Sequence, residues 1–99
     1  MSYVVREATG TITVTPAALA QLVTHAVELV DGARVRRGRR RLEVDIAEGK
    51  ARVELELIAR YGAVLPEIAE AVQARVAAAL ATMCGVEVVQ VDVSVEDVE

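Results

Sequence analysis

The sequence predicts a small α+β domain with two layers, in which two helices pack on one face of a small sheet. Two long stretches place apolar residues with the 3.6-residue period of an amphipathic helix. Four shorter stretches alternate apolar and polar residues, as half-buried strands do. Prolines stand near the start of each helical stretch and glycines near its end. The predicted order is therefore β-α-β-β-α-β.

The chain has 99 residues, enough for one domain. Its first nine residues show no periodic pattern, so we expect a flexible N-terminal arm over residues 1–9 and a single domain over residues 10–99. The first strand is expected over Thr11–Val14, where Ile12 and Val14 alternate with threonines.

The first helix is expected to begin at Thr15 and Pro16. A threonine hydroxyl is a good N-cap, and proline is favoured at the first helical position. Asp31 and Gly32 should end the helix. The apolar stripe comprises Leu19, Leu22, Val23, Ala26, Leu29 and Val30.

A hairpin is expected after a basic connection that runs from Ala33 to Arg41. Its turn is Glu48-Gly49, where glycine permits the positive φ of a tight turn. A two-residue loop there fixes the register. It pairs Leu42 with Leu55 and Val44 with Val53 on the buried face, and Arg41 with Glu56, Glu43 with Glu54 and Asp45 with Arg52 on the outer face.

A second helix and a last strand follow Gly62, which should break the preceding strand. The helix is expected to start near Val64 to Pro66, to run for about 30 Å and to stop at Gly85. Its stripe comprises Leu65, Ile68, Ala69, Val72, Val76, Ala79, Leu80 and Met83. In the last strand Val89, Val91, Val93 and Val95 share one face, and a bulge is expected near Val88 and Val89.

The sheet face away from the helices is expected to be acidic and polar. It comprises Thr11, Thr13, Glu43, Asp45, Glu54, Glu56, Ile58, Gln90 and Asp92. The carboxylates could form a cation site or an acid/base pair, but alternation along half-exposed strands explains them without a function.

The composition limits the classes of function. The chain is 54% hydrophobic but only 2% aromatic, so two tyrosines cannot build the base-stacking platform of many single-strand binders. The single cysteine, Cys84, excludes an intrachain disulfide and fits a reducing compartment. The N-terminus lacks the features of a signal peptide, and the longest uncharged stretch, residues 8–27, is too polar to span a membrane. We therefore expect no membrane span, so any association with a membrane would be peripheral or through a partner.

No catalytic motif is evident. The sequence holds no glycine-rich phosphate loop, no Ser/His/Asp set and no cysteine pair. His25 should face solvent, and Cys84 lies at the end of a helix, where the dipole favours the thiol over the thiolate. We expect no enzymatic activity, no cofactor and no metal.

Arginines form the sharpest local signal in the chain. Six of the eleven basic residues lie between Arg34 and Arg41, so the rest of the chain is strongly acidic. The candidate partner- or anion-binding residues are Arg34, Arg36, Arg37, Arg39, Arg40 and Arg41. They could be a solvated loop that pairs with the acidic strands of the chain itself, a contact for a protein partner, or a site for anionic lipid or nucleic acid.

From Gly10 to Val95 the sequence resembles the alkaline shock protein family, the envelope stress response proteins of Gram-positive bacteria. Four motifs in order carry the resemblance. They are GTITVTPAALA, then VDG, then VELELIARYG leading into EAVQARV, and last MCGVEVVQVDVSV.

The resemblance implies a cytoplasmic, non-enzymatic protein of cell-envelope homeostasis that acts as a scaffold through protein–protein contacts. Some relatives self-associate or are held at the membrane by a separate membrane-anchored partner. The arginine-rich connection is a departure from the family. It supports an alternative function, a nucleic-acid-binding module that uses the loop from Arg34 to Arg41, although the acidic sheet and the scarcity of aromatics oppose it.

Overall fold

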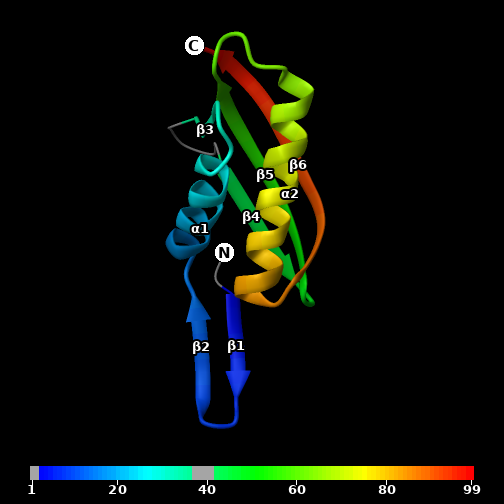
Figure 1. The fold of residues 1–99 in the computed structure, drawn as a ribbon. Helices are drawn as coiled ribbons and strands as arrows, with labels where there is room; N and C mark the ends of the chain where they lie inside the picture. Colours follow the sequence, from blue (N-terminus) through cyan, green and yellow to red (C-terminus); the bar gives the residue numbers. More distant parts are fainter. Residues whose placement is uncertain (1–2, 37–41) are drawn as a thin grey trace.

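The computed structural model of the chain describes residues 3–36 and 42–99. It confirms the α+β class, with α1 and α2 on one face of a sheet (Figure 1). In chain order the elements are β1 (Tyr3–Glu7), β2 (Gly10–Val14), α1 (Pro16–Glu28), β3 (Ala33–Val35), β4 (Leu42–Ala47), β5 (Lys50–Ala59), α2 (Leu65–Cys84) and β6 (Glu87–Val98).

Strand β5 is the centre of a four-stranded mixed sheet. β6 pairs with it in parallel, while β3 and β4 pair with it antiparallel. β4 lies opposite residues 50–55 of β5, and β3 lies opposite residues 57–59. Because β6 occupies one edge of β5, β3 and β4 share the other edge, one after the other.

The described residues on either side of the arginine segment lie close to each other along this shared edge. The backbone N–H of Arg36 donates a hydrogen bond of 2.9 Å to the carbonyl of Glu56. Leu42 lies opposite the next residue of β5, Leu55. Arg36 and Leu42 therefore lie at neighbouring points of one edge, which was not foreseen because β3 was expected to be part of a connection.

The expected hairpin is confirmed in its turn and in most of its register. β4 and β5 pair Val44 with Val53 and Glu43 with Glu54. Glu48 and Gly49 both have positive φ, 53° and 73°, as a two-residue hairpin turn with the twist of the strands requires. The predicted pair that involves Arg41 lies outside the described residues.

Both helix starts are confirmed. The Thr15 hydroxyl accepts a hydrogen bond from the N–H of Ala18, and Pro16 opens α1. α2 starts at Leu65, with its proline in the first turn, and ends before Gly85. The stripe predictions were wrong at their ends, because Leu29 is 59% exposed and Met83 71% exposed.

The bulge expected in the last strand is confirmed. Ala51 lies opposite Val88 and the next residue, Arg52, lies opposite Gln90, so Val89 is the extra residue. This shift moves Val88 onto the core side and leaves Val89 exposed. The prediction that Val89 shares the buried face was therefore wrong.

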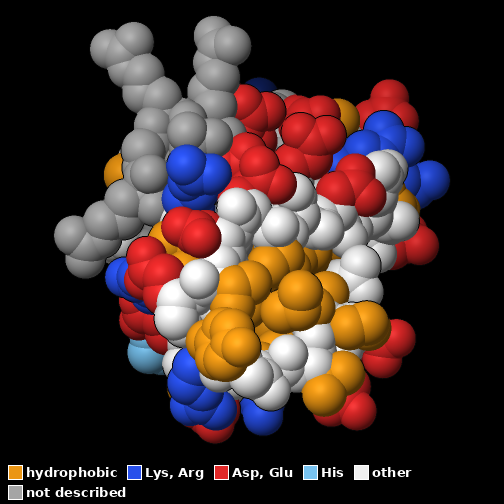
Figure 2. All heavy atoms as spheres, turned by 90° about the horizontal axis from the view of Figure 1, so that it is seen from above, with side chains coloured by type: hydrophobic (Ala, Val, Ile, Leu, Met, Phe, Trp, Pro, Cys, Tyr) orange, Lys and Arg blue, Asp and Glu red, His pale blue; other side chains and the backbone are white. Residues whose placement is uncertain are grey.

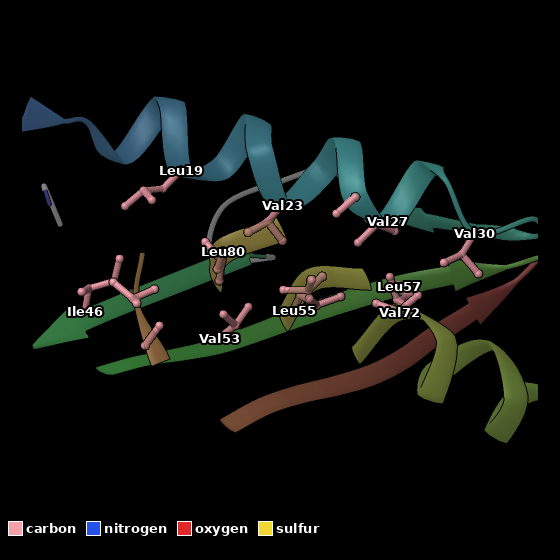
Figure 3. Close-up of a cluster of buried hydrophobic side chains, with 14 residues drawn as sticks. Leu19, Val23, Val27, Val30, Ile46, Val53, Leu55, Leu57, Val72 and Leu80 are labelled. Carbon is pink, nitrogen blue, oxygen red and sulfur yellow. The ribbon is translucent and has the colours of Figure 1, made fainter. Parts of the chain in front are cut away.

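The core fills the space between the helices and the sheet. Leu19, Val23 and Val27 point from α1 toward the strands (Figure 3). Val72, Val76 and Leu80 of α2 and Val53, Leu55 and Leu57 of β5 complete it, all at most 3% exposed. Each such side chain contributes about 1.5–3 kcal/mol by leaving water.

The N-terminal region differs most from expectation. Residues 3–7, expected as a flexible arm, form β1, and β1 pairs antiparallel with β2. β2 was expected in the main sheet, but both edges of β5 are occupied, and the hairpin of β1 and β2 projects from the body instead (Figure 1). Thr11 and Thr13 therefore do not belong to the open face of the main sheet.

Candidate functional site

The two described arginines of the predicted site lie on the open side of β3 and just beyond it. Arg34 is exposed, and its guanidinium forms an ion pair with the carboxylate of Glu99 at the C-terminus. Arg36 is half-buried and is held by its backbone bond to Glu56. Arg37, Arg39, Arg40 and Arg41 lie outside the described residues, so the structure brings together only two members of the set.

Arg60 pairs with another side chain, which was not predicted from the sequence. Arg60 follows β5, and its guanidinium donates two hydrogen bonds to both carboxylate oxygens of Asp31, at 3.0 and 2.9 Å. This bidentate pair ties the end of α1 to the turn before α2. The Arg60 hydrogen bonds, followed by the charge of Arg60, hold the pKa of Asp31 below its ordinary value, and Asp31 raises the pKa of Arg60.

Replacing Arg60 should raise the pKa of Asp31 toward 3.8, its ordinary value. Because the pKa of Asp31 is lower in the folded chain than in the unfolded chain, the pair stabilises the fold above the unfolded pKa, and this stabilisation is lost as the pH falls through the folded pKa. NMR titration of the Asp31 carboxyl in wild-type, Arg60→Gln and Arg60→Lys proteins measures the change. We expect the lysine variant to lie between the other two. Identical titrations in wild-type and Arg60→Gln proteins would contradict the pairing.

The open sheet face carries three carboxylates in one row. Glu54 of β5 lies opposite Glu43 of β4 on one side and opposite Asp92 of β6 on the other. In the neighbouring row Asp45 lies opposite Arg52, as predicted. Within residues 3–36 and 42–99, no group of three or more acidic, histidine or cysteine side chains could hold a metal ion.

Reversing the charge at the centre of this row should stabilise the domain. Glu54→Lys converts two repulsive cross-strand pairs into attractive ones, and each pair changes stability by a few tenths of a kcal/mol to 1 kcal/mol, so we expect a gain of about 1 kcal/mol. Glu54→Gln, which only removes repulsion, should gain about half of that. Urea unfolding at low and high salt measures both effects, with Glu70→Lys on α2 as a control. A loss of stability in Glu54→Lys would show that the row is not repulsive.

The other titratable candidates have the surroundings expected of them. His25 is exposed on α1. Cys84 is partly buried, and burial raises the pKa of its thiol, which makes it a poor nucleophile.

Apart from the hairpin of β1 and β2, the described part of the chain leaves two apolar surfaces uncovered. The first, which we call the apolar end, lies where the turn before α2 meets the C-terminus, and the N–H of Tyr61 bonds to the carbonyl of Glu99 there. It comprises Tyr61, which is 84% exposed, Val64, Leu65 and Val98. Figure 2 looks onto this end of the molecule and shows hydrophobic side chains gathered on it.

The second surface, which we call the helix groove, runs between α1 and α2 on the side away from the sheet. Its volume is about 670 Å³. It is lined by Val14, Ala18, Gln21, Leu22, His25, Ala26, Leu29, Arg75, Ala78, Ala79, Thr82 and Met83. The sequence indicated it only indirectly, because Leu29 and Met83 continue the apolar stripes and were expected in the core.

Fold and surfaces together define a small two-layer α+β domain with exposed apolar surfaces. The chain belongs to the alkaline shock protein 23 family, described as having a cell envelope-related function, because the family model matches residues 34–99. This confirms the resemblance found in the sequence. None of the curated protein sequences matches the chain.

Solved structures of the MamM CTD share the fold. A copper form is 24% identical with a TM-score of 0.61, and the match covers 86% of this chain and 100% of that one. A nickel form is 23% identical with a TM-score of 0.60, covering 84% and 99%. A cysteine-to-serine variant is 24% identical with a TM-score of 0.60, covering 84% and 96%. At these identities the likeness concerns the fold alone.

Of the helices in the described residues, neither combines the length and the apolar character that crossing a bilayer requires.

Proposed function

We propose that this chain is a non-enzymatic protein of the envelope stress response that acts at the cytoplasmic face of the membrane through protein–protein contacts. The observation that carries the proposal is the family match over residues 34–99, with its cell envelope-related function. The apolar end and the helix groove support it, because exposed apolar patches of this kind are typical of interaction sites.

The proposed partners are a membrane-anchored protein and further copies of the chain. In this proposal the membrane-anchored protein holds the chain at the membrane. Of the candidate arginines that the structure describes, Arg34 is paired with Glu99, which partly offsets its charge. Outside the candidate set, Arg60 is paired with Asp31. The same pairs, and the carboxylate row on the open sheet face, give no support to the nucleic-acid alternative.

Membrane vesicles test the proposal. Purified chain should bind native vesicles that expose their cytoplasmic face. It should not bind protein-free vesicles made from lipids extracted from the same membranes. Treating the native vesicles with trypsin, then quenching the protease before the chain is added, should abolish binding.

Two outcomes would oppose the proposal. Equal binding to protein-free vesicles would assign the contact to lipid, and absence of binding to native vesicles would remove the anchored partner. To locate the contact, Tyr61→Asp at the apolar end can be compared with Ala81→Glu, an exposed position on α2 outside both apolar surfaces.

A further inference from the structure

The projecting hairpin packs against little of the rest of the described structure. Its two five-residue strands pair with each other and make no extensive contact with the helices or the main sheet. Ile12 is 55% exposed and shares a face of β2 with Val14, while Val4, opposite Thr13 on the other face, is 47% exposed. A two-stranded hairpin alone is marginally stable in water and needs a further strand or a helix to cover an apolar face. The hairpin therefore requires a covering surface.

The body of the same chain is poorly placed to supply that surface. Only Thr15 separates β2 from α1. Its φ and ψ are −75° and 159°, its hydroxyl caps α1, and the ring of Pro16 restricts the next φ. Folding the hairpin back onto α1 would break this cap.

The helix groove has the length and the character to receive the hairpin. α1 has 13 residues and is about 20 Å long at 1.5 Å per residue. A five-residue strand spans about 17 Å at 3.4 Å per residue. The groove walls carry several alanines, which let another backbone approach closely, and Val14 at the base of the hairpin is one of its lining residues. The apolar side of the hairpin thus continues into the groove.

Charge does not oppose another copy of this acidic chain as the occupant of the helix groove. The net charge is −4, so copies repel each other over most of their surfaces. No lining residue of the groove is acidic, and residues 3–14 hold one arginine and one glutamate, which cancel. The two surfaces can therefore meet without opposing carboxylates.

We propose that the hairpin of one copy docks in the helix groove of a second copy, with Ile12 facing Leu22, Ala79 and Met83. The proposal deepens the proposed function and rests on its self-association, for which it names both contact surfaces. Docking would cover the apolar side of the hairpin and the exposed Leu29 and Met83 at the same time.

Charged substitutions on either surface test the contact. Ile12→Lys and Met83→Glu should each weaken self-association at least about tenfold in sedimentation equilibrium, because each places a charge in an apolar contact. Thr13→Lys, on the opposite face of β2, and Ala81→Glu, outside the groove, are matched controls and should not change it. A mixture of the Ile12→Lys and Met83→Glu proteins should associate more strongly than either alone.

Cysteine cross-linking gives an independent readout. In a Cys84→Ala background, Ile12→Cys protein mixed with Met83→Cys protein should form a mixed disulfide on mild oxidation. Thr13→Cys in place of Ile12→Cys should form much less. Circular dichroism and thermal unfolding of each variant establish that it is folded.

The proposal is overturned if the wild-type chain stays monomeric at all concentrations or if Ile12→Lys and Met83→Glu leave its association unchanged. The second result would leave the proposed function intact, with self-contact through another surface. The first would remove self-association but not the anchored partner, which the vesicle experiment judges separately.

Discussion

Leu57→Ala is expected to destabilise the domain by about 3 kcal/mol, within the range of 2–5 kcal/mol for large-to-small changes in protein cores. Leu57 has no exposed surface and lies on the central strand, opposite Val35 on one side and Val95 on the other. Its side chain belongs to the cluster that also holds Val27 and Val72 (Figure 3). Truncation leaves a cavity that neither sheet edge nor helix can close alone.

Urea unfolding at a fixed protein concentration measures this loss. Small domains have about 5–15 kcal/mol of stability in total, so the variant should unfold at a much lower urea concentration. Leu29→Ala is the matched control, because Leu29 is 59% exposed and lies just beyond the last residue of α1. The control should change stability by less than about 0.5 kcal/mol. Equal losses in the two variants would show that β5 is not the centre of the core.

Local signals in the sequence predicted the parts of the fold that depend on local chemistry. Thr15 with Pro16, Glu48 with Gly49, and Gly85 each fix a cap or a turn with neighbouring residues only, and all three were confirmed. The bulge at Val89 was also predictable. Val88 is out of step with the alternation of the later valines in the strand, and one extra residue restores the alternation.

The errors in the predicted fold arose where segments distant in the sequence compete to pair with the same strand. β2 alternates as a sheet strand should, but β5 has only two edges, which β6 on one side and β3 and β4 on the other already occupy. Ala33–Val35 has only two apolar residues around one arginine, which is too short a pattern to separate from a connection. Its pairing depends on β5.

The burial of Leu29 and Met83, at the ends of the apolar stripes, was mispredicted for a related reason. Helical periodicity shows that Leu29 and Met83 continue the apolar stripes but not whether each contacts the sheet or the space between the helices. Val23 and Val76 are buried, whereas Leu29 and Met83 line the helix groove, although Val30, next to Leu29, is still buried. Of the candidate site, the sequence located the arginines but could not foresee that Arg34 is paired with Glu99, 65 positions away.

Gly85→Val is expected to cost about 2 kcal/mol through the backbone alone. Gly85 ends α2 in the left-handed conformation, with φ 67° and ψ 25°, and its N–H bonds to the carbonyl of Ala81 at 3.2 Å. A Cβ at this position would meet no atom within 4 Å, so no steric contact with neighbouring residues contributes. The cost arises because a β-branched residue is strongly disfavoured at positive φ.

Gly85→Asn separates conformation from side-chain size. Asparagine tolerates the left-handed region, so this variant should lose less than about 1 kcal/mol although its side chain is as large as that of valine. Urea unfolding of both variants measures the difference. Equal losses of stability in the two variants would contradict the explanation by positive φ. Because Gly85 directs the chain from α2 to the buried Val86 just before β6, the left-handed turn also sets where the parallel strand enters the sheet.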